Sequence, residues 1–262
     1  MAPPVRLERR DRVAIVTLDR AERLNAVGSG MVAALIAVLE DVSADRSVGC
    51  VVVTGEGRAF SAGADISEFA AFTTASEFEA FIGAMAAAFV ALQELPQPSI
   101  AAVNGVALGG GFELALACDL RVASAAARLG VPEVKLGLLP GAGGTARLTR
   151  MLPSGVAKQL LLTGEPVTAD EALRLGLVNE VVADGAAAGA RALTIAAHLA
   201  SLPSGCLAAA KRLVDGGGEL TLPGAILLER EMVTALFATP DREEGVAAFL
   251  EKRPARFDHG RT

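Results

Sequence analysis

The chain has 262 residues, a formal net charge of −6, and a composition with 52% hydrophobic and 21% charged residues. These values exclude a disordered chain or a coiled coil and predict one large domain, or a domain with an appendage, around a sizeable core. The acidic balance disfavours nucleic acid as a partner. Because no apolar run spans a bilayer uninterrupted and the first residues lack a signal-peptide core, we expect a cytoplasmic protein with no membrane partner.

The side-chain inventory restricts the chemistry. Tyr and Trp are absent, and histidine occurs only at His198 and His259. Cys50, Cys118 and Cys206 lie far apart in apolar sequence without metal or redox spacing, which predicts buried thiols and no metal site. Acid–base catalysis would therefore fall to carboxylates, lysine or cysteine.

The first elements predict an α/β architecture. Residues 12–19 (RVAIVTLD) have strand character, and residues 29–42 carry apolar side chains at helical spacing, with Ser29 as the expected N-cap. Residues 50–54 form a short β-branched strand before a Gly-Glu-Gly turn. Strand, helix and strand in this order favour helices packed outside sheets.

Residues 60–68 (FSAGADISE) form a loop of small residues that opens into a helix. They fit an ordinary glycine-containing loop with Asp65 as the cap, or a set of backbone N–H donors next to another glycine-rich segment. Residues 76–95 then predict an amphipathic helix without a basic residue.

The central stretch, residues 98–119 (PSIAAVNGVALGGGFELALACD), is the most informative. A strand at 100–103 ends in an Asn-Gly turn, and three glycines at 109–111 precede an apolar helix that contains one carboxylate, Glu113. Such a carboxylate requires a partner or neutralisation, and glycines let another molecule approach free N–H groups. The segment fits either a site for chemistry at a carbonyl group or a glycine-rich turn with a glutamate at a helix start.

A second carboxylate, Glu133, lies between Pro132 and Gly137, which predict a loop or a short turn. Local sequence alone favours a solvated side chain there. Residues 140–145 (PGAGGT) resemble a phosphate-binding loop, but they lack the Lys-Ser/Thr ending of a P-loop and the acidic ribose ligand of a dinucleotide site.

The remainder of the chain is predicted to be helical, at 155–162, 169–175, 185–201 and from residue 204 onward, with a break at glycines 216–218. The longest later segments are 220–237 and 242–253. Their apolar side chains exceed what a monomer would leave exposed, which predicts subunit packing through Leu222, Ile226, Leu227, Val233, Leu236 and Phe237.

Five segments in series resemble the enoyl-CoA hydratase/isomerase, or crotonase, family over nearly the whole chain: DRAERLNAV (19–27), FSAGADISE (60–68), AAVNGVALGGGFELALACD (101–119), GVPEVKLGLLPGAGGTARL (130–148) and FATPDREEGVAAFLEKR (237–253). The resemblance implies a spiral of ββα repeats over residues 1–200. It also implies a helical trimerisation region over residues 201–262, with a homotrimer or a dimer of trimers as the assembly.

The resemblance also assigns site residues. It places an oxyanion hole at the backbone N–H groups of Ala64 and Gly110, and the catalytic carboxylates at Glu113 and Glu133. Ser67 departs from the family pattern, because many relatives carry a basic residue there near the phosphates of coenzyme A. Further substrate contacts are expected at Ala62, Asp65, Ile66, Gly109, Pro132 and Gly141.

The implied activity is hydration of trans-2-enoyl-CoA thioesters to 3-hydroxyacyl-CoA, in fatty-acid or related acyl-CoA degradation. Glu113 would activate water and Glu133 would protonate the α-carbon. Coenzyme A enters with the substrate, so no separate cofactor is expected. A double-bond isomerase or a specialised dehydratase remains the alternative, while an RNA-binding or non-catalytic homologue is more remote because residues 76–95 have no basic face and both acids are present.

Overall fold

The computed structural model describes residues 3–257. Within this range, six strands form a large sheet in the order β1-β2-β3-β5-β7-β10, parallel except for the β1–β2 hairpin. Its strands are β1 (Val5–Arg10), β2 (Val13–Leu18), β3 (Cys50–Gly55), β5 (Ser99–Val103), β7 (Leu120–Ser124) and β10 (Glu180–Val182).

A smaller sheet repeats the same progression. Its described strands are β4 (Ala59–Ser61), β6 (Val106–Leu108), β8 (Arg128–Gly130) and β9 (Val167–Thr168), in that order. Strands β3, β5 and β7 pair in parallel in the large sheet, and their successors β4, β6 and β8 pair in parallel in the small one. The chain therefore winds as repeats of one strand in each sheet, and a helical segment follows each pair.

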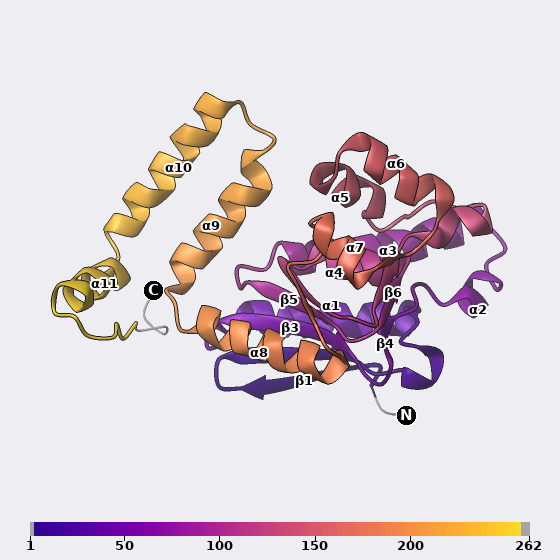
Figure 1. The fold of residues 1–262 in the computed structure, drawn as a ribbon, viewed down its shortest axis with the longest axis horizontal. Coiled ribbons are helices and arrows are strands. Elements are labelled where there is room, and N and C mark those ends of the chain that lie inside the picture. Colours follow the sequence, from indigo (N-terminus) through magenta and orange to yellow (C-terminus); the bar gives the residue numbers. More distant parts are fainter. Residues whose placement is uncertain (1–2, 258–262) are drawn as a thin grey trace.

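The described helices cover both sheets and extend beyond them (Figure 1). They are α1 (Ser29–Ala44), α2 (Ile66–Phe69), α3 (Ala75–Gln93), α4 (Gly110–Ala117), α5 (Gly144–Met151), α6 (Ser154–Thr163), α7 (Ala169–Arg174), α8 (Gly185–Ala200), α9 (Ser204–Gly217), α10 (Leu222–Phe237) and α11 (Pro240–Leu250), with 3₁₀ turns η1 (Ala21–Arg23) and η2 (Pro132–Leu136).

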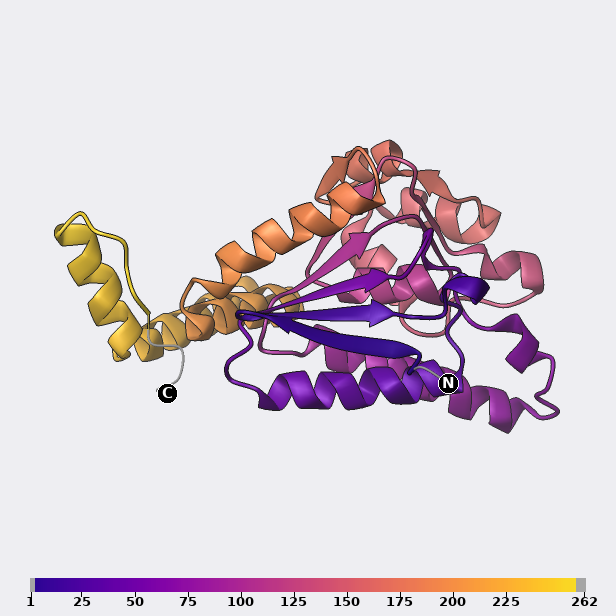
Figure 2. The ribbon, with the colours of Figure 1, turned by 90° about the horizontal axis from the view of Figure 1, so that it is seen from below.

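Helices lie on both faces of the large sheet (Figure 2), and a cluster of buried apolar side chains lies on each face. Helix α8 covers one face through alanines at every fourth position, a spacing that places them on one side of the helix. Helix α1 packs on β1 and β2 at the other face, where the main core lies, and α3 packs against α1 and α4. The alanine stripe consists of Ala188, Ala192, Ala196 and Ala200.

Helix α3 is a core helix with a capping box. The Thr74 hydroxyl accepts from the Glu77 N–H, and the Glu77 carboxylate accepts from the Thr74 N–H. By length and composition α3 is apolar enough to cross a membrane, a test that the core helices of globular proteins also pass. Its buried face packs into the main core through Phe81, Met85, Ala88, Phe89 and Leu92.

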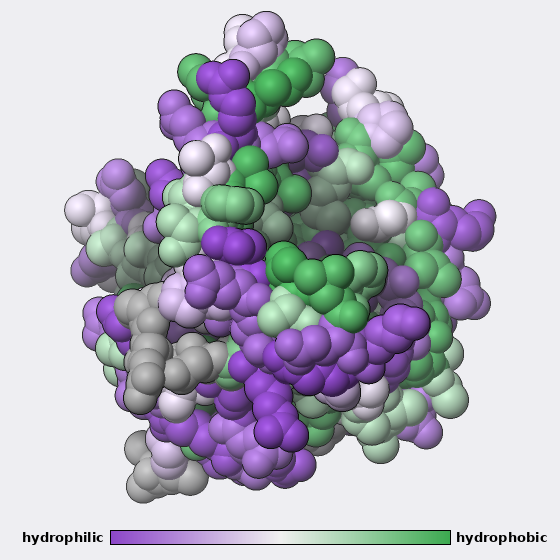
Figure 3. All heavy atoms as spheres, turned by 90° about the vertical axis from the view of Figure 1, so that its left-hand side faces the viewer, coloured by the Kyte–Doolittle hydropathy of each residue, from purple (hydrophilic) through white to green (hydrophobic). Residues whose placement is uncertain are grey.

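Helices α9, α10 and α11 project from the body as an arm (Figure 1). The predicted exposure is confirmed for Leu222, Ile226, Leu227, Val233 and Phe237, whereas Leu236 is half-buried. Helix α11 adds Phe249, which is 82% exposed. Figure 3 faces this end of the molecule and shows apolar side chains around a hollow. One expectation was wrong: Cys206 is exposed because α9 leaves the core there, whereas Cys50 and Cys118 are buried as expected.

The boundary of α1 differs from the prediction. Ser29 is the first helical residue and Gly28 is the N-cap, without a side-chain cap of its own. The cap comes from a distant segment, because the Glu68 carboxylate accepts from the Ser29 N–H and hydroxyl. The division at residue 200 coincides with the end of α8 but stays a prediction, and positions 1–2 and 258–262 of the predicted regions lie outside the described residues.

Candidate active site

Two loops bring unpartnered backbone donors together. Gly109 adopts a left-handed φ of 52° and turns the chain from β6 into α4, so that Gly110 begins the helix. A methyl group on Gly110 would lie 3.6 Å from the Ala64 nitrogen. Within residues 3–257, neither the Ala64 N–H nor the Gly110 N–H has a hydrogen-bond acceptor. The expected pair of donors therefore exists as adjacent, free N–H groups.

Glu113 lies one turn into α4 and is 1% exposed. Its Oε1 accepts from the N–H groups of Ala142, at 2.9 Å, and Gly144, at 2.7 Å. Burial raises the pKa of Glu113, while these two donors and the positive charge of Arg147 oppose that rise. The glycine-rich segment 140–145 thus binds an anion, but the anion is the protein's own carboxylate. Among the described residues, Oε2 has no donor.

Glu133 is held on η2, where Pro132 starts the 3₁₀ turn and Gly137 ends it in a left-handed conformation. Its Oε2 is buried without a hydrogen-bond partner. Burial, followed by the charge of Glu113, raises the pKa of Glu133 to about 7. The local expectation of a solvated loop residue is wrong, because the chain folds η2 back over Gly109, whose added methyl group would lie 3.0 Å from the Glu133 Oε1.

Both carboxylates and both free N–H groups line one cavity of about 70 Å³. The expected contacts Ala62, Ile66, Gly109, Pro132 and Gly141 line it as well. The cavity lies where the loop before α2, the start of α4 and η2 meet. The structure therefore brings together residues that are up to 79 positions apart in sequence, from Ala62 to Gly141.

Asp65 is the exception among the expected contacts, because it does not line this cavity. Its side chain caps α2 by accepting from the Ser67 N–H, and it forms an ion pair with Arg20 at 3.1 Å. The Ser67 hydroxyl also donates to the Asp65 carboxylate and is the largest cause that keeps the pKa of Asp65 below its ordinary value, with Arg20 and the Ser67 N–H acting in the same direction. Arg23 donates to the Ser67 hydroxyl at 3.1 Å, which places a positive charge beside this serine.

Sequence reasoning left the apolar wall of the cavity unassigned. Phe69 and Phe78 form it together with Ile82 and Met85 of α3 and with Leu136, Leu138 and Leu139 near η2. Phe69 contacts Phe78 edge-to-face at 5.2 Å between ring centroids. The signal in the sequence was the concentration of phenylalanines between positions 69 and 81 in a chain with ten phenylalanines.

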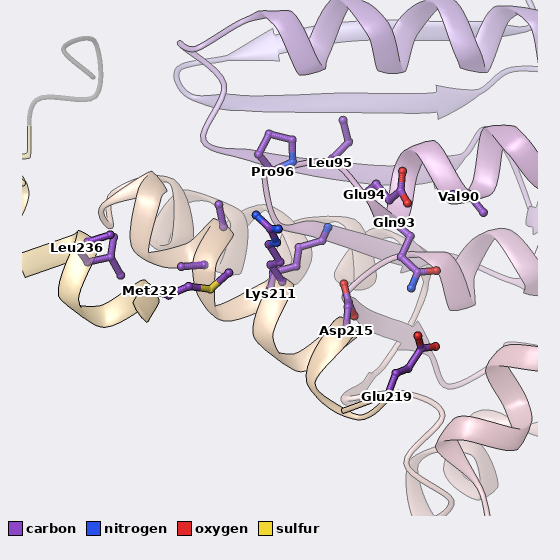
Figure 4. Close-up of a pocket in the computed structure, with 15 residues that line it drawn as sticks. Val90, Gln93, Glu94, Leu95, Pro96, Lys211, Asp215, Glu219, Met232 and Leu236 are labelled. Carbon is purple, nitrogen blue, oxygen red and sulfur yellow. The ribbon is translucent and has the colours of Figure 1, made fainter. Parts of the chain in front are cut away.

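A larger cavity lies elsewhere and contains none of the expected site residues (Figure 4). It is about 870 Å³ in volume and is open between the arm and the end of α3. Lys211, Asp215 and Glu219 lie on one side of it, and Gln93 and Glu94 lie on the other. Size alone would point to this groove, but it lacks the buried carboxylates and free donors that chemistry requires, so the small cavity is the candidate active site.

The fold and the cavity define a class of site in which backbone N–H groups receive a developing negative charge and two buried carboxyl groups handle protons. Comparison with known proteins agrees. The family model described as enoyl-CoA hydratase/isomerase matches residues 8–260. The chain belongs to the enoyl-CoA hydratase/isomerase family.

Individual relatives match over almost their whole length. A probable enoyl-CoA hydratase of Mycobacterium bovis is 42% identical, with 97% of each chain covered. A short-chain-enoyl-CoA hydratase of Clostridium acetobutylicum is 41% identical, with 94% of each covered. The crystal structure of an enoyl-CoA hydratase subunit from Geobacillus kaustophilus superposes with a TM-score of 0.92 at 42% identity over 98% of both chains. The predicted ββα spiral of the crotonase type is confirmed.

Proposed function

We propose that this protein is an enoyl-CoA hydratase, a hydro-lyase that adds water across the double bond of trans-2-enoyl-CoA thioesters to give 3-hydroxyacyl-CoA. One observation carries the proposal. Two buried carboxyl groups, Glu113 and Glu133, share a cavity with the unpartnered N–H groups of Ala64 and Gly110. The names of the relatives support the same reaction.

The thioester oxygen would accept from the Ala64 and Gly110 N–H groups. When water adds to the β-carbon, the π-electrons move toward the carbonyl and an enolate forms, with its negative charge on that oxygen. Preorganised donors stabilise this charge, and loss of one such donor typically costs about a hundredfold to a thousandfold in rate. Because both donors are backbone groups, their direction is set by the turn at Gly109 and by the loop around Ala64.

The two carboxyl groups have different environments and different assigned tasks. Glu113 has two N–H donors on Oε1 and the nearby Arg147 charge, which favour its ionised form, and its free Oε2 would take a proton from the attacking water. Glu133 has a pKa of about 7 and a buried oxygen without a partner, so up to about neutral pH a large share of the molecules holds a proton to give to the α-carbon. After turnover, proton exchange returns Glu113 to the ionised form and Glu133 to the protonated form.

We further propose how coenzyme A is bound, how the chains assemble and where the enzyme is located. The Arg23 guanidinium, which donates to the Ser67 hydroxyl, would supply the positive charge for the phosphate groups of coenzyme A. Coenzyme A enters as part of the substrate, and the reaction needs no further cofactor. The exposed apolar residues of the arm support a homotrimer or a dimer of trimers. We place the enzyme in the cytoplasm, in fatty-acid or related acyl-CoA degradation.

Crotonyl-CoA, a short trans-2-enoyl thioester, tests the proposal through loss of the absorbance of its conjugated thioester. The wild type should hydrate it, and Glu113→Gln and Glu133→Gln should each lower kcat by about a hundredfold to ten-thousandfold. The double variant should be little worse than the poorer single variant, because partners in one step are not additive. Glu79→Gln, an exposed carboxylate on α3, is the matched control and should retain wild-type activity.

Either single variant with activity within a few-fold of the wild type would defeat the two-carboxylate mechanism. Thioester binding should survive in all variants, since the oxyanion donors are unchanged backbone groups. A wild type that moves the double bond of a 3-enoyl-CoA but does not hydrate crotonyl-CoA would identify an isomerase instead.

A further inference from the structure

Three successive peptide groups, from Gly141 to Gly144, lie behind Glu113. The peptide N–H groups of Ala142 and Gly144 donate to the Glu113 Oε1. The carbonyl of Ala142, which belongs to the peptide between these two donors, faces away and accepts from the Arg147 Nη1 at 2.9 Å. Backbone N–H groups arranged in this way form an anion-binding nest, here closed at its back by a guanidinium.

The turn at Gly143 makes this nest possible. Gly143 has a φ of +103°, a conformation that side chains oppose. A methyl group added there would lie 2.1 Å from the Arg147 Nη1, so the guanidinium occupies the space beside this glycine. Arg147 therefore folds back from α5 onto the loop that precedes its own helix.

A second hydrogen bond fixes the guanidinium. The Gln93 Oε1, at the end of α3, accepts from the Arg147 Nε at 2.9 Å. Both side chains also line an open cleft of about 800 Å³ on the side away from the active-site cavity. Because open space lies there, the orientation of the guanidinium depends on its two hydrogen bonds more than on packing.

We propose that Arg147 is a positioning residue for the reaction: it holds the peptide between Ala142 and Gly143 so that the flanking N–H groups stay directed at Glu113, and Gln93 holds Arg147 in turn. The inference rests on the proposed function for its catalytic consequence, because only an ionised, correctly placed Glu113 can accept the proton of water. The contacts themselves do not depend on that function.

Few charges face Glu113 among the described residues. Glu133 approaches from η2 and Arg147 from α5. Strands β4 and β6, which pack against α4, bring no ionisable side chain, and Glu77 and Glu79 of α3 are exposed. Burial raises the pKa of Glu113 and Arg147 opposes this, so removal of the guanidinium moves the pKa further upward.

The test uses Arg147→Met, which keeps much of the stem and deletes the charge and both hydrogen bonds. We expect kcat for crotonyl-CoA to fall about tenfold to a hundredfold with KM nearly unchanged, and the acidic limb of the pH profile to move to higher pH. Arg147→Lys should restore the position of that limb but only part of kcat, since an ammonium lacks the planar fork that reaches two acceptors. Arg150→Met, on the same helix and exposed, should match the wild type.

Two measurements separate positioning from general structure. In a Glu113→Gln background, Arg147→Met should cost almost nothing, because its effect acts through the carboxylate. An infrared titration of the Glu113 carboxyl, with Glu113→Gln as the difference reference, should show a raised pKa in folded Arg147→Met. An equal loss in both backgrounds, or an unchanged Glu113 titration, overturns the inference. Absence of hydration by the wild type overturns the proposed function, and the titration still decides the inference.

Discussion

At the scale of single residues, Glu133 combines a catalytic assignment with a cost in stability. An ordinary glutamate titrates near pH 4.5, whereas burial raises the pKa of Glu133 to about 7. Below pH 4.5 both folded and unfolded chains carry the proton, so this side chain does not affect folding. As pH rises to about 7 the unfolded chain gains by ionising while the folded chain does not, and stability falls.

Glu133→Gln should therefore stabilise the protein at pH 8 while lowering kcat about a hundredfold to ten-thousandfold. An amide does not ionise, so the free energy of unfolding should rise by about 1 kcal/mol after allowance for partial exposure, or roughly 2–4 °C in Tm. Thermal unfolding at pH 4.5 should show little difference between the two proteins. A gain that is equal at both pH values, or a loss confined to pH 8, would contradict the raised pKa.

The sequence-based expectations and the structure differ most for the two carboxylates, Glu113 and Glu133. Glu113 was visible because a carboxylate in an apolar helix is unusual, and its helix was predicted within two residues at its start. Glu133 has no such signal, since a proline-bounded turn looks the same whether it faces solvent or a cavity. Only the winding of the chain, which places η2 against Gly109, decides its burial.

At the scale of elements, the strands and helices were largely predictable because their apolar periodicity is strong. Their ends were less so: the cap of α1 comes from Glu68, which is 39 positions from Ser29 in sequence. The loop at 140–145 was recognisable as an anion-binding type, but sequence could not reveal that its anion is Glu113. In both cases, long-range contacts supply what local patterns do not encode.

A partly buried ion pair joins the arm to the body in the described part of the chain. The Lys211 Nζ of α9 lies 2.9 Å from the Asp119 Oδ2, and the same carboxylate accepts from the N–H and hydroxyl of Ser99 at the start of β5. The side chains of Lys211 and Asp119 are 10% and 22% exposed, so water replaces a lost partner only in part.

Lys211→Met should loosen α9 from the body and lower the free energy of unfolding by about 1–3 kcal/mol, because it leaves Asp119 without its cation. Hydrogen exchange should quicken along α9 before it quickens in the large sheet. Arg150→Met breaks the exposed pair with Glu219 and serves as the reference, with a change within about 0.5 kcal/mol. Equal effects of the two substitutions would show that the Lys211 pair is not an anchor.

At the scale of the whole molecule, the arm leaves apolar surface without cover in the single chain. Leu222 is 74% exposed and Leu250 is 73% exposed, and both belong to helices that project from the body. Such a surface favours association between copies.

We expect light scattering at micromolar concentration to give the mass of a trimer or a hexamer. Phe237→Glu combined with Phe249→Glu should shift the population toward smaller species, since charges in an apolar interface oppose association. A wild type that is a monodisperse monomer would refute the predicted assembly. The paired substitution lies outside the active-site cavity, so any smaller species can be tested separately for hydration.

The proposed oxyanion donors are main-chain N–H groups, so they persist through most substitutions as the sequence diverges. A side-chain replacement at position 64 or 110 alters crowding, but it cannot delete an N–H group unless it introduces proline. Replacements at positions 113 and 133 instead change which groups accept and donate protons, while the two backbone N–H donors remain. Descendants of this sequence can therefore lose hydration and still stabilise an enolate, so that new reactions start from an intermediate that the backbone already accommodates.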